Sequence, residues 1–239
     1  MLLDKFWRAD RGFVHTLNLA DRRWQTLSQG PRGHYERTYR DGMQFGESGP
    51  SRHSLALAAW AGLCELPGRQ DTIMSVLNDT ELQPVITAYF AYYEQMARAL
   101  CGDRPGALTR MRDYVGEQIE RHDSSCCWES YEPEVTDFRR WGLHEFPKSL
   151  CHGWSSGIVG LSMRHLLGLE PKSPGFRAVS IRPPVDLPWT FESTVPTPEG
   201  AIHVLRDEEG GPIRYRLPGT VRHVGPTPEG IELEGGAQE

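Results

Sequence analysis

The sequence predicts a mainly α-helical protein with a small β appendage at its C-terminal end. Apolar residues recur at helical spacing in successive segments between residues 51 and 169. From Pro171 the pattern changes to short alternating stretches separated by Gly and Pro. Since the 239 residues allow two small domains, we expect a helical domain over residues 1–170 and an antiparallel β domain over residues 171–239.

The first fifty residues carry the weakest pattern. Leu2, Leu3 and Phe6 sit at helical spacing before Gly12, so residues 1–8 read as the tail of a helix. Residues 10–50 are polar and rich in Gly, Arg and Tyr, which predicts a long loop. Loops of that length are uncommon unless they are functional or disordered.

Regular helical segments follow this loop. Each has an apolar stripe, and each is bounded by a capping or stop residue such as Ser51, Pro67-Gly68, Cys101-Gly102 or Pro105. Short turns between such helices favour αα-hairpins packed side by side. The expected helices are residues 51–66, 69–79, 85–100, 105–122 and 155–169.

The last part of the chain reads as short strands. The stretch PTPEG occurs at residues 196–200 and 226–230, each time just before an apolar alternation, and a repeated turn explains it. The expected strands are residues 175–183, 201–207, 212–219, 220–225 and 230–235.

Composition excludes several classes of function. The net charge is −6 and the sequence pI is about 5.9, whereas nucleic-acid binding needs a basic surface. The sequence has no apolar run long enough to span a membrane, and MLLDKFWRADRG lacks the layout of a signal peptide. The five cysteines form no CxxC pair, so we expect reduced thiols in a cytoplasmic protein, without a metal site or cofactor.

Acidic and aromatic residues gather after residue 122. The stretch CCWESYEPEV, residues 126–135, places Trp128 beside Glu129. Glycoside hydrolysis needs two carboxylates, one as an acid and one as a base or nucleophile, and aromatic rings stack on sugars. Trp128 and Glu129 are therefore candidate sugar-site residues, although a solvated glutamate fits the same pattern. Glu132 and Glu134 read as an exposed acidic turn, and Trp141 could line a cleft.

A second stretch, CHGWSSG at residues 151–157, precedes the last expected helix. His152 could donate to a sugar hydroxyl or orient a water molecule, and Trp154 could stack on a sugar ring. The alternative is a histidine that bonds to backbone carbonyls in a glycine-rich turn. Ser155 or Ser156 reads as a helix N-cap, and the GxSxG pattern of serine hydrolases is absent.

Four aromatic residues lie within five positions of the helix expected at residues 85–100. Tyr89, Phe90, Tyr92 and Tyr93 cannot all face one core, because neighbours on a helix are about 100° apart. Core packing accounts for some of them, and a cleft lining is the alternative for others. We select Tyr92 as a candidate substrate contact.

Several of these stretches together resemble a known family. FWRADRGFV, SRHSLALAAWAGL, ITAYFAYYEQMARAL, CCWESY, SLCHGWSSGIVGLSMRHLLGLEPKSPGFRAVSIRP and STVPTPEGAIHV occur in this order between residues 6 and 204. The order resembles the C-terminal half of bacterial α-L-rhamnosidases, the family 78 glycoside hydrolases. The most specific part is the stretch from HGW through LGLEPKSPGF to VPTPEGAI.

The resemblance implies an inverting six-hairpin glycosidase, in which an (α/α)6 barrel precedes a small antiparallel β domain. It places the general base at Glu129 and a sugar-binding histidine at His152, with Trp128 and Trp154 beside them. The family's general acid lies in a motif of the type D-x-P-x-R-x-E-R-x-G-W-x-G-D, which this sequence does not contain. Residues 1–170 are thus expected to form an incomplete barrel without its acid.

Three hypotheses for function remain open at this stage. In the first, the chain is a truncated or split rhamnosidase that hydrolyses terminal α-L-rhamnosyl residues only with an N-terminal half-barrel chain or by self-association. In the second, it is a non-catalytic remnant that binds rhamnose-containing oligosaccharides or a protein partner. In the third, it is a different (α/α) hydrolase or lyase whose acid is Glu47, His53 or Asp137.

Overall fold

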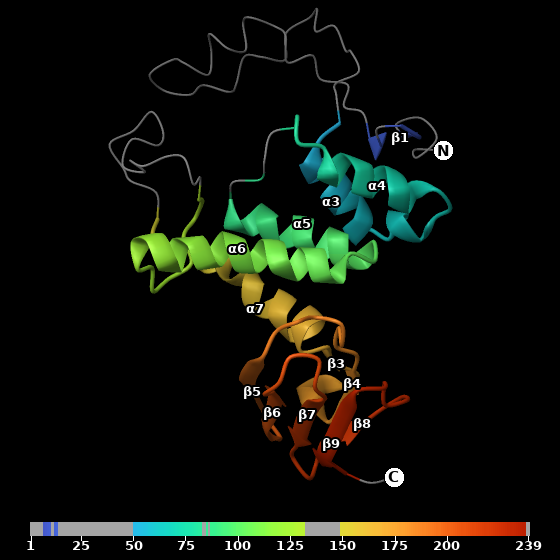
Figure 1. The fold of residues 1–239 in the computed structure, drawn as a ribbon. Helices are drawn as coiled ribbons and strands as arrows, with labels where there is room; N and C mark the ends of the chain where they lie inside the picture. Colours follow the sequence, from blue (N-terminus) through green and yellow to red (C-terminus); the bar gives the residue numbers. More distant parts are fainter. Residues whose placement is uncertain are drawn as a thin grey trace, which may run out of the picture. The chain divides into compact units, whose positions relative to one another are not determined.

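A computed structural model describes residues 7–10, 12–13, 50–82, 85, 87–131 and 149–237. The chain divides into two compact units, Met1–Val85 and Ile86–Glu239. The described residues contain five α-helices, α3 to α7, and two small mixed β-sheets, which confirms the expected helices followed by a β part (Figure 1). The domain boundary predicted at residues 170 and 171 falls inside the second unit.

The first unit combines a short strand pair with two helices. Strand β1 (Trp7–Arg8) pairs antiparallel with β2 (Gly12–Phe13). Helix α3 (Arg52–Trp60) is followed, after a short 3-10 turn, by α4 (Arg69–Asn78). The prediction that residues 1–8 end a helix is therefore wrong at Trp7 and Arg8, and residues 1–6 lie outside the described residues.

The strand pair of the first unit is held against its helices. Gly12 has a φ of 72°, and a Cβ atom at this position would collide with the side chain of Leu55, which is fully buried. The hydroxyl of Thr72 donates to the carbonyl of Ala9 at 2.7 Å. Gly12 thus supplies both the positive φ and the close approach that the turn between β1 and β2 requires.

The second unit begins with two long helices that lie side by side (Figure 1). Helix α5 (Ala88–Leu100) starts after Thr87, whose hydroxyl accepts from the backbone N–H of Phe90. Helix α6 (Arg104–His122) starts after Asp103, whose carboxylate accepts from the N–H of Gly106 at 3.0 Å. Both starts lie within three residues of the predicted ones, since side-chain caps at helix N-termini leave a clear sequence signal.

The helix predicted at residues 155–169 is broken into shorter pieces. A 3-10 turn at Gly153–Ser156 leads into α7 (Gly157–Leu161), and one π-helical stretch follows at Ser162–Leu166. The helix stops at Gly168, which has a φ of 61° and lies so close to the backbone of Pro183 that a Cβ atom would not fit. Leu169 already belongs to a strand.

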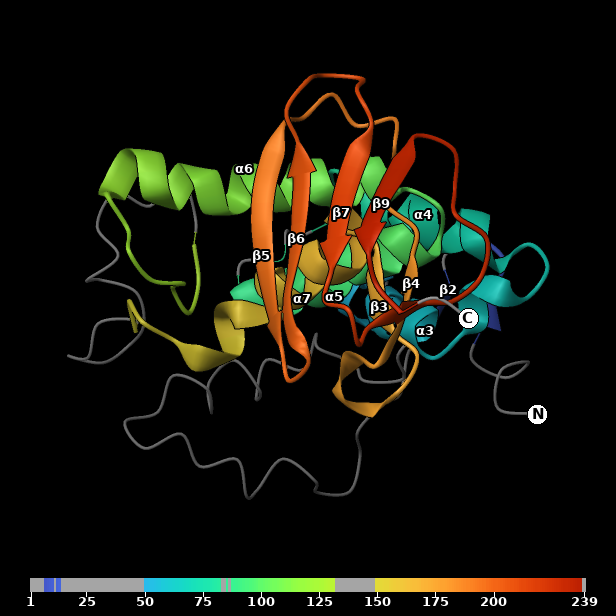
Figure 2. The ribbon, with the colours of Figure 1, turned by 90° about the horizontal axis from the view of Figure 1, so that it is seen from below.

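The β part forms two sheets. Strand β3 is Leu169–Pro171, β4 is Ala178–Ile181 and β8 is Arg222–His223, and they pair in the order β3-β4-β8. The four-stranded sheet has the order β5-β6-β7-β9, from β5 (Phe191–Thr197), β6 (Gly200–Arg206), β7 (Ile213–Leu217) and β9 (Ile231–Gly235), as Figure 2 shows. The β7–β9 and β4–β8 pairs are parallel, so the prediction of an antiparallel domain is wrong for these pairs.

One apolar core joins the two sheets to the end of the helical part. Val204, Ile213 and Val221 are fully buried in it, and Leu166 packs against it from the π-helical stretch. The hydroxyl of Tyr215 donates to the carbonyl of Leu167 at 2.7 Å, which satisfies a buried phenol. No helix among the described residues is both long and apolar enough to cross a membrane.

Candidate functional site

The segment that carries Glu129 is fixed at the start of α5. Ser130 forms an isolated antiparallel bridge with Thr87, and the N–H of Ala88 donates to the carbonyl of Glu129 at 3.3 Å. These two contacts hold the backbone of Glu129 against the first turn of a helix that is itself buried along one face.

A second segment runs along the other side of Glu129. The N–H of Glu129 donates to the carbonyl of Ser149 at 2.9 Å, and the N–H of Ser149 returns a bond to Oε2 of Glu129 at 3.2 Å. The N–H of His152 donates to the carbonyl of Cys127 at 2.9 Å. The backbone of one segment thus orients the Glu129 carboxylate and places His152 beside it.

The side chains of Glu129 and His152 lie next to each other. Nδ1 of His152 lies 3.9 Å from Oε2 of Glu129, and their side chains keep exposed fractions of 28% and 35% respectively. This separation is longer than a direct hydrogen bond, so the pair can also accommodate a water molecule or a hydroxyl that contacts both groups. The carboxylate can accept a proton, and an imidazole can both donate and accept a hydrogen bond.

Aromatic rings extend from this pair along α5. The ring of Trp154 lies 4.3 Å from that of His152 and 5.6 Å from that of Tyr89, and its exposed fraction of 52% leaves a face open to solvent. The hydroxyls of Tyr89 and Tyr93 are 3.3 Å apart, and this hydrogen bond, together with burial, raises the pKa of Tyr93. We call Tyr89, Tyr93 and Trp154 the aromatic cluster.

Trp128 lies in the interior instead of beside the Glu129 carboxylate. Its exposed fraction is 6%, and its ring is 5.1 Å from that of His122 and 6.1 Å from that of Tyr131. Adjacent residues of an extended segment point to opposite sides. The alternation that leaves Glu129 accessible therefore turns the Trp128 side chain inward, where it packs beneath the site.

Tyr92 also packs against the fold. A Cβ atom on Gly157 would lie 2.6 Å from Cγ of Tyr92, so the phenol ring covers the first residue of α7. The ring of Tyr92 also lies 5.3 Å from that of Tyr93, so the candidate chosen from the sequence borders the aromatic cluster. Tyr89 and Tyr93 are four residues apart, which places both on one helix face. Trp141 lies outside the described residues.

The third hypothesis for function names Glu47, His53 and Asp137 as candidate acids, and Glu132 and Glu134 are expected in an exposed turn. His53 lies on α3 in the first unit. Glu47, Glu132, Glu134 and Asp137 lie outside the described residues. Within the described part of the chain, no group of three or more His, Cys, Asp or Glu side chains could hold a metal ion.

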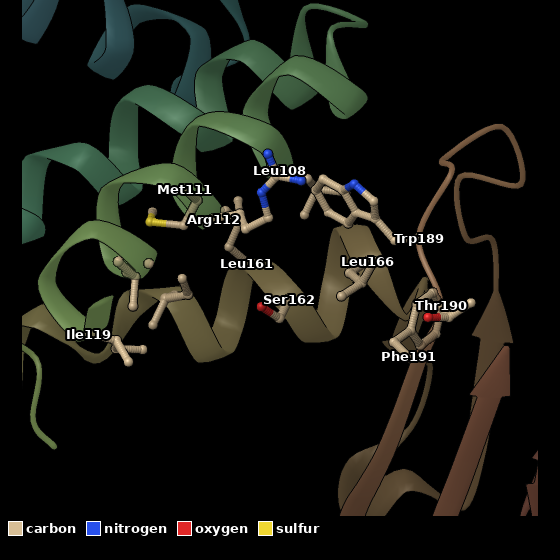
Figure 3. A pocket seen from close by; sticks show the side chains of 13 residues that line it. Leu108, Met111, Arg112, Ile119, Leu161, Ser162, Leu166, Trp189, Thr190 and Phe191 are labelled. Carbon is tan, nitrogen blue, oxygen red and sulfur yellow. The ribbon is translucent and has the colours of Figure 1, made fainter. Parts of the chain in front are cut away.

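The second unit also contains an apolar groove between α6, α7 and the approach to β5. Its volume is about 420 Å³, and Leu108, Met111, Leu161 and Phe191 are among its lining residues (Figure 3). Among the described residues that line it, Arg112 is the one charged residue. Arg112 lies 5.0 Å from the ring centre of Trp189 and forms an ion pair with Asp113. These described lining residues include no carboxylate, so they cannot supply the acid–base chemistry that Glu129 offers.

The structure thus defines a protein with a helical part followed by small mixed sheets, and with a carboxylate–imidazole pair beside an aromatic cluster. Its fold is similar to that of a solved GH78 family rhamnosidase of Bacillus sp. GL1, with a TM-score of 0.59 and 24% sequence identity. The match covers 79% of this chain and 20% of that chain, so this chain spans about one fifth of the rhamnosidase. No protein-family model and no curated protein matches the sequence.

Proposed function

We propose that this chain carries the base-bearing half of an α-L-rhamnosidase-like site and that Glu129 is the general base of an inverting hydrolysis of terminal α-L-rhamnosyl residues. The observation that carries the proposal is the 3.9 Å contact between His152 and Glu129, beside an indole that is 52% exposed. The fold likeness to a rhamnosidase and the order of sequence motifs support the same substrate class.

In the proposed reaction, a water molecule bound by the Glu129 carboxylate attacks the anomeric carbon from the face opposite the leaving group. Glu129 takes the proton of that water while a second carboxylic acid protonates the departing glycosidic oxygen. The backbone N–H of Ser149, 3.2 Å from Oε2, keeps the carboxylate aimed in one direction. His152 hydrogen-bonds a sugar hydroxyl, and Trp154 stacks on the apolar face of the ring.

The second carboxylic acid is proposed to come from another chain. The family motif that carries it is absent from the sequence, and the helices are proposed to form part of an incomplete (α/α)6 barrel. An N-terminal half-barrel chain or a second copy would complete the site. Apolar helix faces that such a partner would cover favour association at about 25 cal/mol per Å² buried.

A second candidate function is carbohydrate binding without hydrolysis. The observation that favours it is the aromatic cluster, because an exposed indole beside a tyrosine pair can hold a sugar ring without any acid. The two functions share the ligand and differ in turnover.

One experiment separates these functions. Two assays are run on the native chain, on Glu129→Gln and on Glu120→Gln. Saturation-transfer NMR measures binding of L-rhamnose, and release of nitrophenol from an aryl α-L-rhamnoside measures turnover. Glu120→Gln is the control, because it changes an exposed glutamate of α6. We expect rhamnose binding by the native chain and by Glu120→Gln. Turnover that appears only on adding an N-terminal half-barrel chain and vanishes in Glu129→Gln supports hydrolysis.

Binding without turnover under all conditions supports the binding function instead. Absence of rhamnose binding by the native chain would contradict both. Turnover by the isolated chain that persists in Glu129→Gln would show that another carboxylate is the base.

A further inference from the structure

Three of the five cysteines lie close in sequence to Glu129 or His152. Cys126 and Cys127 precede Glu129, and Cys151 precedes His152. Cys126 and Cys151 are exposed, whereas Cys64 and Cys101 are buried, and all five are free thiols. Only Cys64 and Cys101 are shielded from solvent by burial, and Cys127 is partly exposed.

Backbone contacts bring the two exposed thiols together. The segments around them are tied by the bond from His152 N–H to the Cys127 carbonyl and by the bond from Glu129 N–H to the Ser149 carbonyl, each at 2.9 Å. Cys126 directly precedes Cys127, and Cys151 directly precedes His152, so the bond between Cys127 and His152 brings both cysteines to the same part of the two segments. A contact with the Cys126 thiol also raises the pKa of the Cys151 thiol, which agrees with this placement.

We propose that Cys126 and Cys151 form a reversible dithiol–disulfide site that locks together the two segments carrying Glu129 and His152. The oxidant is a low-molecular-weight disulfide of the glutathione class. One cysteine thiolate attacks this disulfide and releases one thiol, leaving a mixed disulfide on the protein. The second cysteine thiolate then attacks the protein sulfur and releases the second thiol, so two cysteines are oxidised and one disulfide is reduced.

The neighbouring groups favour this pair over the alternatives. Side-chain hydroxyls hold both cysteine backbones, because Ser124 donates to the Cys126 carbonyl at 2.6 Å and Ser149 donates to the Cys151 carbonyl at 2.9 Å. Cys127 is only partly exposed and its carbonyl is engaged by His152. Cys126 and Cys151 are thus the two exposed thiols on these tied segments.

The pH dependence of the reaction follows from the same contact. The contact with the Cys126 thiol raises the pKa of the Cys151 thiol. Since only the thiolate attacks, bond formation becomes faster as the pH rises from neutral toward alkaline values. Among the described residues, the thiol of Cys127 also raises the pKa of the Cys151 thiol, by a smaller amount.

The proposal concerns the backbone under the site and does not depend on the sugar. Once formed, the bond would prevent the two segments from separating, while it leaves the contact between Glu129 and His152 in place. We therefore expect slower hydrogen exchange at the amides of Glu129 and His152 in the oxidised protein, by about tenfold or more, because local opening is suppressed.

The test treats the full chain with oxidised glutathione, blocks remaining thiols, and maps the disulfide-linked peptides by mass spectrometry without reduction. We expect a Cys126–Cys151 link in the native chain and in the control Cys127→Ser, and none in Cys126→Ser or Cys151→Ser. Reduction with dithiothreitol should restore the free thiols.

A link between Cys126 and Cys127, a link between Cys127 and Cys151, or glutathione adducts alone would overturn the proposal. Hydrogen exchange provides the second readout. A Cys126–Cys151 bond that leaves exchange at Glu129 and His152 unchanged would contradict the locking of the segments. Rhamnose binding plays no part in either measurement, so failure here is distinct from failure of the proposed function.

Discussion

Nδ1 of His152 lies 3.9 Å from Oε2 of Glu129 although the two residues belong to different segments of the chain. Backbone hydrogen bonds hold the two segments together. One of them runs from the N–H of His152 to the carbonyl of Cys127, two residues before Glu129. The side chains are thus free to contact a ligand while their backbones are held.

The first prediction concerns the imidazole. We expect His152→Ala to weaken binding of L-rhamnose about tenfold, the size of effect that follows loss of one hydrogen bond to a buried ligand group. An NMR titration of L-rhamnose measures the affinity. His203→Gln, which changes an exposed histidine of β6, serves as the control and should bind as the native chain does. If His152→Ala and His203→Gln bound L-rhamnose with equal affinity, His152 would not be a sugar-binding residue.

The second prediction contrasts the two tryptophans. Trp128 is 6% exposed and Trp154 is 52% exposed. Trp128→Ala should lower the free energy of unfolding by roughly 3–5 kcal/mol, because it removes a buried ring from the packed interior. Trp154→Ala should change stability little and weaken rhamnose binding. Urea unfolding and the NMR titration measure the two effects, and a stability loss of equal size in both variants would contradict this assignment.

Helix positions were predictable because their signals are local. The expected helices at residues 69–79 and 105–122 agree with α4 and α6 to about one residue at each end, since a glycine or an aspartate stands at the start of each. Strand direction left no such signal. Parallel and antiparallel strands alternate with the same period, so the parallel pairing of β7 with β9 could not be read from the residues.

Motifs of the sequence single out Glu129, His152 and Trp154 as candidates, and these three side chains lie close together in the structure. The inward direction of Trp128 depends on which face of its segment packs against the fold, which is a tertiary property. Residues three and four apart lie side by side on a helix, so spacing alone could not show that Tyr92 packs against Gly157, which is also a tertiary property.

The third prediction uses two glycines of α7 as a matched pair. A Cβ atom on Gly157 would lie 2.6 Å from Cγ of Tyr92, whereas one on Gly160 would lie 3.9 Å from the Tyr92 hydroxyl. Gly157→Ala should therefore destabilise the chain by roughly 1–3 kcal/mol through overpacking. Gly160→Ala should be neutral or stabilising, since alanine is the better helix former. Thermal unfolding checks both, and equal melting temperatures would contradict the close contact.

The fourth prediction concerns a buried histidine. His165 is 6% exposed, and neither ring nitrogen has a hydrogen-bond partner among the described residues. Burial, with smaller contributions from the charges of Arg104 and Arg164, lowers the pKa of His165 from 6.5 to about 4. Between these two pH values, His165 is protonated in the unfolded chain and neutral in the folded chain. The free energy of unfolding therefore decreases as the pH falls from about 6.5 to about 4.

The decrease in the free energy of unfolding that His165 causes should reach at most about 3 kcal/mol at pH 4, given the size of its pKa shift. Urea unfolding between pH 7 and pH 4 measures it for the native chain, for His165→Leu and for the exposed control His203→Gln. His165→Leu should flatten the dependence of unfolding free energy on pH, because leucine cannot take up the proton. His203→Gln should keep the native slope, and a slope that is unchanged in His165→Leu would show that other groups govern the acid sensitivity.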